Sequence, residues 1–524
     1  MRKISIYDTT LRDGSQSEGI SYSVEDKIKI SRGLDKFGID FIEGGWPYSN
    51  PKDTELFSYF KKHKLRKSKL VAFGSTMYPN TSANEDKNLL SLLKAGTEYV
   101  TIFGKSWDLH VRDVLRVSLD ENLRMIYESI KFLGKRRKVF YDAEHFFDGF
   151  KANPEYALKT LKAAESAGAE CLVFCDTNGG ALVSEVKDII SKVKKDIKSP
   201  LGIHTHNDFG LALATSLAAV EEGCIHVQGT INGYGERCGN ADLATIIPLL
   251  RLKFNRDSVS FAQLKKIKRL SIFISEISNV KHPDNHPFTG KSAFAHKAGV
   301  HVNAMVKNVN AYEAINPDLV GNKRRFLISE LSGKTSIIVT AKSLEYDLDK
   351  KSPKVKKIHK LLQEKEKRGY QFEAAEASFK LLLEKELSRY KKFFNLSGFR
   401  VIVEKKENEE IVSEAVVKLK VKNNFRHTVS EGDGPVNALD NALRKALVKF
   451  YPCLSGMHLS DFKVRVLDES KGTAAKVRVL IESRDKEETW STVGVSENII
   501  EASWEALADS VEYKLLKEMK KKKK

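Results

Sequence analysis

The sequence predicts an α/β fold, namely a closed (β/α)8 TIM barrel followed by a helical region and a small α+β domain. Over the first 240 residues, short runs of β-branched or aromatic residues end in polar or glycine-rich residues and are followed by amphipathic stretches. Eight such runs occur about thirty residues apart, which is typical of a barrel built from βα units. The predicted strands are residues 4–13, 41–46, 70–75, 99–103, 139–144, 171–176, 201–206 and 226–232.

Helical patterns separate these strands, for example over residues 23–37 and 154–167. An open doubly wound sheet is the alternative, because it also alternates strands with helices. Polar residues lie at or just after the carboxyl ends of most of the predicted strands, as expected where the strand ends of a barrel line one mouth. They are Arg12, Asp13, Glu43, Ser75, Glu144, Asp176, Thr177, Asn178, His204 and His206.

We expect three regions, with boundaries at residues 1–275, 276–398 and 399–524. A chain of 524 residues is too long for one core, because cores stop growing near ~250 to 300 residues. The βα repeat disappears after about residue 275, where a helical, lysine-rich region begins. The last region is expected to be α+β and carries no catalytic cluster.

Alternation predicts the first strand of that region, since the apolar residues at 415, 417, 419 and 421 alternate with lysines. A glycine-rich turn at 431–435 then opens a helix through residue 447. Strands at 462–467 and 475–482 and a helix at about 497–516 complete the expected domain.

Composition excludes several classes of protein. An apolar fraction of 41% and a charged fraction of 30% are typical of a soluble globular chain, and no run approaches the ~20 apolar residues of a membrane span. The first residues lack the apolar core of a signal peptide, so we expect a cytoplasmic protein without membrane association. Five cysteines without a C-x-x-C pair indicate neither a disulfide framework nor a zinc knuckle.

The net charge of +19 permits nucleic-acid binding, but much of the excess lies in residues 350–406 and in the lysine run 520–524. We interpret that run as a solvated tail. No nucleic-acid partner is expected.

His204 and His206 lie two residues apart in a predicted strand, so their side chains share a face and can meet one ion. Two hydrogen-bonded interior histidines are the alternative. Asp13 ends the first predicted strand, which lies near strands seven and eight once a barrel closes, and completes a facial two-histidine, one-carboxylate site. A non-haem iron oxygenase could use the same set. Asn240 could add a neutral oxygen; Mg²⁺, Mn²⁺ and Zn²⁺ all stay possible.

Three motifs, DTTLRDGSQ at 8–16, HTHND at 204–208 and GERCGNA at 235–241, resemble the 2-isopropylmalate, homocitrate and citramalate synthases. The likeness extends through FAHKAGVH at 294–301 and GDGPVNA at 432–438 and so covers nearly the whole chain. Aldolases and carboxylases of the same superfamily share only the first two motifs. The resemblance implies a metal-dependent condensation of acetyl-CoA with a 2-oxo acid.

The resemblance also implies roles for single residues. Asp13, His204 and His206 would hold the ion, with Asn240 in or beside its shell. Arg12 would bind the keto oxygen and Thr177 the substrate carboxylate, while a structural salt bridge is the alternative for Arg12. Glu144 and His301 are both candidates for assisting the removal of the acetyl proton. Tyr312 would belong to the substrate site, although its match to the family's motif is weaker. The histidine at 301 would come from a partner subunit, which implies a homodimer.

Residues 41–53 look like the type of synthase in this family that uses pyruvate and forms citramalate, although Tyr48 stands where that type has glycine. Trp46, Phe73, Phe103 and Phe146 would narrow the pocket toward a methyl substituent. A 2-isopropylmalate synthase, which takes 2-oxoisovalerate, is the main alternative. The homocitrate type would need an extra cation in the pocket.

An inactive metal-binding scaffold is an alternative of a different class, against which the presence of every ligand and of Arg12 argues. The C-terminal region resembles the family's regulatory domain. That likeness implies allosteric inhibition by isoleucine, and a dimerisation module without ligand is the alternative.

Overall fold

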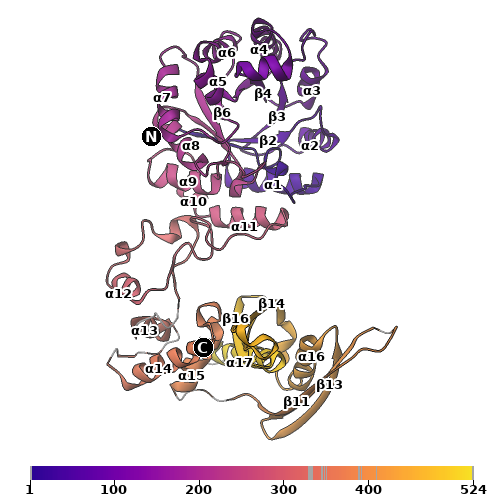
Figure 1. Ribbon diagram of the computed structural model, residues 1–524, viewed down its shortest axis with the longest axis vertical. Coiled ribbons are helices and arrows are strands. Elements are labelled where there is room, and N and C mark those ends of the chain that lie inside the picture. The colour runs from indigo at the N-terminus through magenta and orange to yellow at the C-terminus, as the bar shows by residue number, and fades with distance from the viewer. Residues whose placement is uncertain are drawn as a thin grey trace. The chain divides into compact units, whose positions relative to one another are not determined.

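The computed structural model of the protein describes residues 3–327, 334–343, 346, 348–349, 351–387, 390, 392–408 and 410–521. Its first part is a closed barrel of eight parallel strands in chain order, with helices outside the strands (Figure 1). Closure joins the first strand to the last, where Ser5 pairs with His226 and Asp8 with Gly229. The strands are β1 (Ser5–Asp8), β2 (Phe41–Gly45), β3 (Lys69–Ser75), β4 (Tyr99–Lys105), β5 (Lys138–Glu144), β6 (Cys171–Asp176), β7 (Leu201–Thr205) and β8 (His226–Gly229).

Several of the barrel helices begin at local capping signals. Ser23 and Asp26 form a reciprocal capping box at the start of α1, and Asn153 caps α6 with Pro154 in its first turn. The helices are α1 (Val24–Phe37), α2 (Pro51–Lys62), α3 (Lys87–Ala95), α4 (Leu119–Gly134), α5 (Phe146–Ala152), α6 (Pro154–Ser166), α7 (Val183–Val193), α8 (Ala212–Glu221) and α9 (Leu243–Leu252).

The predicted barrel is confirmed, and each predicted strand overlaps an observed one. Four predicted strands were too long at their carboxyl ends, since β1 ends at Asp8, β2 at Gly45, β7 at Thr205 and β8 at Gly229. In β1 the physical reason is a turn: the Asp8 carboxylate accepts hydrogen bonds from the Thr10 amide and hydroxyl at 3.0 and 2.9 Å, which ends the extended backbone.

The chain divides into two compact units, Met1–Phe294 with Ile315–Lys323 and Ala295–Ala314 with Arg324–Lys524. The first unit adds α10 (Phe261–Leu264) and α11 (Ile267–Ile277) to the barrel. The second begins with a two-stranded pair and four helices: β9 (Ala295–His296), α12 (Gly299–Lys307), β10 (Arg325–Phe326), α13 (Lys334–Ser343), α14 (Pro353–Lys367) and α15 (Glu376–Glu386). The expected boundaries at residues 275 and 398 stay predictions.

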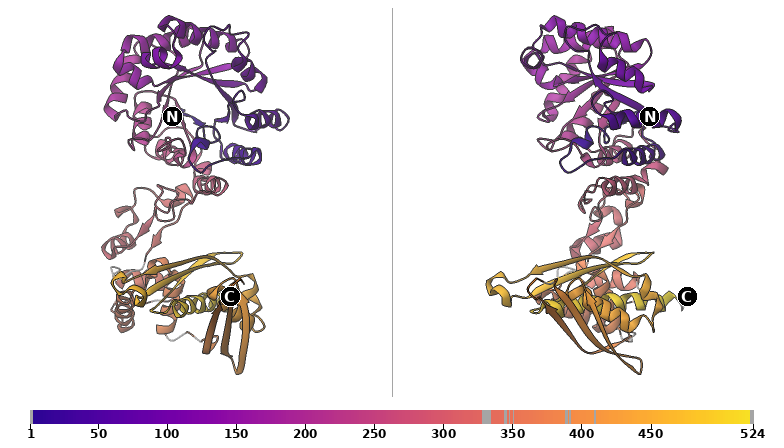
Figure 2. Two further views of the ribbon diagram at one scale, coloured as in Figure 1. Left: turned by 45° about the vertical axis from the view of Figure 1, so that its right-hand side comes forward. Right: turned by 90° about the vertical axis from the view of Figure 1, so that its right-hand side faces the viewer.

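The remainder of the second unit contains two three-stranded antiparallel sheets, visible in both views of Figure 2. One comprises β11 (Asn395–Glu404), β12 (Val412–Val421) and β13 (Asn424–Gly432), the other β14 (His458–Val466), β15 (Val477–Arg484) and β16 (Thr489–Ser496). The helices α16 (Pro435–Leu447) and α17 (Ile499–Lys521) provide much of the core.

The alternation over residues 415–421 does mark the buried face of β12. The strands β11, β13 and β16 were missed. Most side chains of β11 and β13 are exposed or half-buried, so these two strands carry little apolar periodicity. The solvated-tail interpretation was wrong for Lys520 and Lys521, which belong to α17 and form ion pairs with Glu384 and Glu487; residues 522–524 lie outside the described residues.

Among the described residues, no helix combines the length and apolar character that crossing a membrane requires.

Candidate functional site

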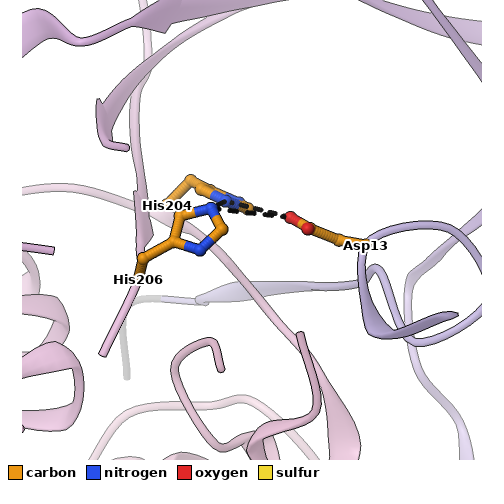
Figure 3. A group of neighbouring side chains, drawn as sticks. All are labelled: Asp13, His204 and His206. Atoms are coloured by element: carbon orange, nitrogen blue, oxygen red, sulfur yellow. Dashed lines mark hydrogen bonds and ion pairs between the residues drawn. The ribbon is translucent and has the colours of Figure 1, made fainter. Parts of the chain in front are cut away.

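Three side chains converge at the mouth of the barrel. The Nε2 atoms of His204 and His206 lie 3.3 Å apart, and Asp13 Oδ2 lies 3.3 Å from the first and 3.9 Å from the second. Figure 3 shows the carboxylate and the two rings facing one another. In the described part of the chain, this is the one cluster of at least three histidine, cysteine or acidic residues with such close ligand atoms.

Three different elements supply these ligands. His204 belongs to β7, and His206 follows the strand in an isolated bridge with Asn240. Asp13 was predicted to end the first strand but lies beyond it, inside a turn in which the Arg12 and Gly14 amides donate to the Thr9 carbonyl at 3.1 and 3.0 Å. The turn, rather than the strand itself, places the carboxylate.

The surroundings of the cluster fit a cation. The Asn240 Oδ1 atom is buried without a hydrogen-bond partner among the described residues, while its Nδ2 donates to the Tyr234 carbonyl at 3.3 Å. A buried carbonyl oxygen without a donor is costly unless a ligand satisfies it. Two imidazoles, a carboxylate and an amide oxygen form a donor set that suits a divalent metal.

Electrostatics prepares the ligands for such an ion. Burial alone would raise the pKa of Asp13, but Arg12 and His204 hold it well below its ordinary value. Burial, assisted by the neighbouring His204, lowers the pKa of His206 to about 4. At neutral pH the site therefore offers an anionic carboxylate and a neutral imidazole at 206, the forms in which both bind metals.

Arg12 is held rigidly beside this cluster. Its Nε donates to Glu43 Oε1 at 2.6 Å, and its guanidinium lies 3.8 Å from the centre of the Phe73 ring. Glu43 is fully buried and also accepts from the Tyr7 hydroxyl at 2.6 Å. The Arg12 guanidinium is thus fixed in position before any substrate binds.

A cavity of about 260 Å³ opens beside these groups. Side chains from the ends of all eight barrel strands and their following loops line it: Arg12, Asp13, Gln16, Trp46, Phe73, Phe103, Asp142, Glu144, Cys175, Thr177, His204, His206, Glu236 and Arg237. Of the four aromatic residues predicted to narrow it, Phe146 does not line the cavity. That ring is buried in α5 against the rings of Phe147 and Phe174, because it lies past the end of β5.

Trp46, Phe73 and Phe103 form one aromatic wall, with ring centres 5.6 to 5.9 Å apart. The Trp46 indole donates to Asn88 Oδ1 at 2.8 Å, and its backbone amide donates to Asp53 Oδ2 at 2.8 Å. The preceding Gly45 has a φ of +136°, and a side chain there would collide with the Asp53 carboxylate. The glycine pair in residues 44–45 therefore allows the loop to present the indole.

Glu144 and Thr177 both face the cavity. Glu144 ends β5 and forms an ion pair with Lys105 at the end of the neighbouring β4. The Thr177 hydroxyl oxygen accepts from the His145 amide at 2.9 Å, so its proton stays available for an acceptor in the cavity.

His301 and Tyr312 belong to the second unit, whereas the other predicted site residues belong to the first. Their rings stack with centres 4.1 Å apart, and both side chains are exposed. Their predicted roles stay predictions.

The sequence analysis gave no role to six polar residues at or behind the cavity: Gln16, Lys105, Asp142, Gln228, Glu236 and Arg237. Arg237 donates to Asp208 at 2.7 Å and to the Thr177 carbonyl at 2.8 Å, which ties together the loops after β6, β7 and β8. Burial, with a smaller contribution from Glu43, raises the pKa of Asp142 to about 7. For Asp142 and Gln228, which lie inside predicted strands, their polarity was the available signal, because a polar residue in the barrel interior must face a polar partner.

Family models match three consecutive parts of the chain. Residues 3–270 match the HMGL-like model, residues 288–368 the homocitrate synthase post-HMGL domain-like model, and residues 373–515 the LeuA allosteric (dimerisation) domain.

Curated relatives match over almost the full length. An (R)-citramalate synthase of Geobacter sulfurreducens is 54% identical over 99% of this chain and 98% of its own. An (R)-citramalate synthase of Aquifex aeolicus is 53% identical over 98% of both chains. A 2-isopropylmalate synthase of Methanocaldococcus jannaschii is 29% identical over 99% of this chain and 96% of its own.

We expect the purified chain to bind a divalent ion at the three-ligand cluster and His206→Ala to weaken that binding severely. The loss should exceed the roughly 10- to 100-fold that follows when only a supporting partner is removed. Calorimetric titration of metal-stripped protein with Mn²⁺ measures the affinity. His63→Ala, which removes an exposed ring stacked on Tyr59, is the control and should bind like the parent. Equal Mn²⁺ affinity in His206→Ala and the parent would place the ion elsewhere.

Proposed function

Because the chain belongs to the (R)-citramalate synthase family, we propose that its barrel condenses acetyl-CoA with pyruvate and hydrolyses the thioester to give citramalate and CoA. The observation that carries this proposal is the placement of Asp13, His204 and His206 beside a fixed Arg12 in one cavity. This is an acyl transfer in which the acyl group becomes an alkyl group. It would supply the first step of a threonine-independent route to isoleucine.

The carbonyl of pyruvate must become more electrophilic before a carbon nucleophile attacks it. A divalent ion held by Asp13, His204 and His206, with Asn240 in or beside its shell, would supply a Lewis acid that polarises this carbonyl. Arg12 presents a fixed positive charge where the alkoxide develops. The Thr177 hydroxyl, whose proton is not used by His145, would donate a hydrogen bond to the substrate carboxylate.

The acetyl methyl group must lose a proton before the new carbon–carbon bond forms. Glu144, which faces the cavity, is the first candidate for assisting the removal of this proton. Its ion pair with Lys105 keeps the carboxylate in place. His301 is the second candidate, supplied with Tyr312 by a partner chain in a homodimer. Water then cleaves the thioester, which makes the sequence effectively irreversible.

Pyruvate is favoured over larger 2-oxo acids by the aromatic wall of Trp46, Phe73 and Phe103. The wall resists displacement because Asn88 and Asp53 hold Trp46 on two sides. The higher identity to the (R)-citramalate synthases than to the 2-isopropylmalate synthase supports the same choice.

The substrate prediction is that pyruvate has the highest kcat/KM of a panel of 2-oxo acids. The two extra methyl groups of 2-oxoisovalerate should cost roughly 10- to 200-fold or more in kcat/KM, because each methylene is worth about 1–3 kcal/mol where the wall cannot yield. Release of free thiol from acetyl-CoA measures the rates.

Trp46→Ala should reduce the discrimination between pyruvate and 2-oxoisovalerate, whereas Tyr48→Ala, at an exposed position beyond the wall, should not. A preference for 2-oxoisovalerate would assign the chain to the alternative synthase, and no thiol release with any acid would favour the inactive scaffold.

The prediction for His301 is that it serves the barrel of a partner chain. Its ring is exposed and stacked on Tyr312, in the same unit as residues 373–515, which match the LeuA allosteric (dimerisation) domain, and it is therefore available to a second copy. Inactive His301→Ala and inactive His206→Ala chains should recover partial activity when mixed, since one of the two sites in a mixed dimer would be intact. Absence of recovery despite subunit exchange, verified with differently tagged chains, would contradict sharing.

We propose further that the C-terminal domain binds isoleucine as an inhibitor. Its match to the LeuA allosteric (dimerisation) domain supports a regulatory role. The turn before α16 supplies a candidate contact, because Gly432 packs closely against the Ala438 amide and leaves no room for a side chain. Backbone amides at this turn would bind the carboxylate of the amino acid.

Isoleucine binding is expected to be coupled to acetyl-CoA binding by typically ~1 to 3 kcal/mol, with equal reciprocal effects on the two affinities. Calorimetry on the full chain with and without acetyl-CoA measures this coupling. Gly432→Ala should weaken isoleucine binding, whereas Gly456→Ala, where a side chain meets open space, should not. No isoleucine binding by the parent would leave dimerisation as the domain's role.

A further inference from the structure

Gln228 is a fully buried polar residue of β8 for which the proposed chemistry gives no role. Its Oε1 atom lies 3.0 Å from His204 Nδ1, and its Nε2 atom donates to Asp142 Oδ1 at 3.0 Å. The three side chains come from β7, β8 and β5, so the contacts form a line through the barrel interior that ends at a metal ligand.

The first contact determines which nitrogen of His204 carries the proton. A carboxamide oxygen only accepts hydrogen bonds, so Nδ1 must be protonated to donate to it. In a neutral imidazole the other nitrogen, Nε2, then carries the lone pair. Nε2 is the atom that lies 3.3 Å from both Asp13 Oδ2 and His206 Nε2, at the position where a metal would bind.

The second contact determines which way the amide of Gln228 points. Asp142 Oδ1 accepts a hydrogen bond from the amide nitrogen, which directs the amide oxygen toward His204. A reversed amide would set its nitrogen against Nδ1 of His204 and favour the tautomer whose Nε2 is protonated. That tautomer cannot coordinate an ion through Nε2. A weaker contact of 3.5 Å to His226 Nε2 lies on the same nitrogen side of the amide.

We propose that Gln228, oriented by Asp142, is a positioning residue that selects the metal-binding tautomer of His204. Supporting partners of this kind fix ring orientation and typically contribute 10- to 100-fold to metal affinity. The inference rests on the metal site of the proposed function, but it concerns affinity for the ion and is independent of the substrate.

A merely structural role for Gln228 would predict loss of stability without a specific loss of metal binding. Gln228→Met removes the acceptor at similar length. Gln228→Asn remains polar but withdraws the amide from both partners, so it provides a second test if the methionine variant fails to fold. Thr205→Val is the matched control. The Thr205 hydroxyl is buried in β7, the strand that carries His204, but it forms hydrogen bonds with Ser216 and the Ala212 carbonyl.

The experiment titrates metal-stripped full-length protein with Mn²⁺ by calorimetry and records the unfolding midpoint of each metal-free variant. We expect the dissociation constant to rise about 10- to 100-fold in Gln228→Met and Gln228→Asn. Thr205→Val should change the unfolding midpoint but not the Mn²⁺ affinity.

Two outcomes separate this inference from the metal site itself. If the parent protein binds no Mn²⁺, the metal site of the proposed function fails. If the parent binds Mn²⁺ and Gln228→Asn and Gln228→Met bind it equally well, the metal site stands and the positioning role is overturned.

Discussion

Closure of the barrel between β1 and β8 is the constraint on which the site depends. The ladder from Ser5–His226 to Asp8–Gly229 fixes the start of the chain against its last barrel strand, which in turn pairs with β7. Only this closure brings the turn carrying Asp13 to the histidines of β7. A one-residue shift in such a ladder would turn interior side chains outward and separate the ligands.

The barrel interior concentrates charge that has to be compensated. Asp13, Glu43 and Asp142 are all buried, and Arg12 is paired with the first two. Buried ions cost several kcal/mol each unless partners satisfy them. A divalent cation at the cluster would therefore complete an arrangement that is otherwise rich in carboxylates, so binding of the ion and stability of the barrel interior should be linked.

Rigidity at the mouth comes from contacts behind the residues that face the cavity. Glu43 holds Arg12, Asn88 and Asp53 hold Trp46, and Gln228 holds His204. Asp53 is itself paired with the buried Lys27 of α1. Preorganised groups lose little freedom when substrate binds, which is how a scaffold of helices and strands supports chemistry at its loops.

The sequence by itself determined the eight strands, the helices near residues 23–37 and 154–167, the shared face of His204 and His206, and the buried face of β12. Each of these is encoded locally, because backbone preference and burial periodicity depend on neighbours within one element. Tertiary structure alone decided that a turn delivers Asp13, that Phe146 packs away from the cavity, and that Asp142 and Gln228 support His204. These outcomes depend on strand register and barrel closure, which join residues far apart in the chain and leave no periodic trace in the sequence.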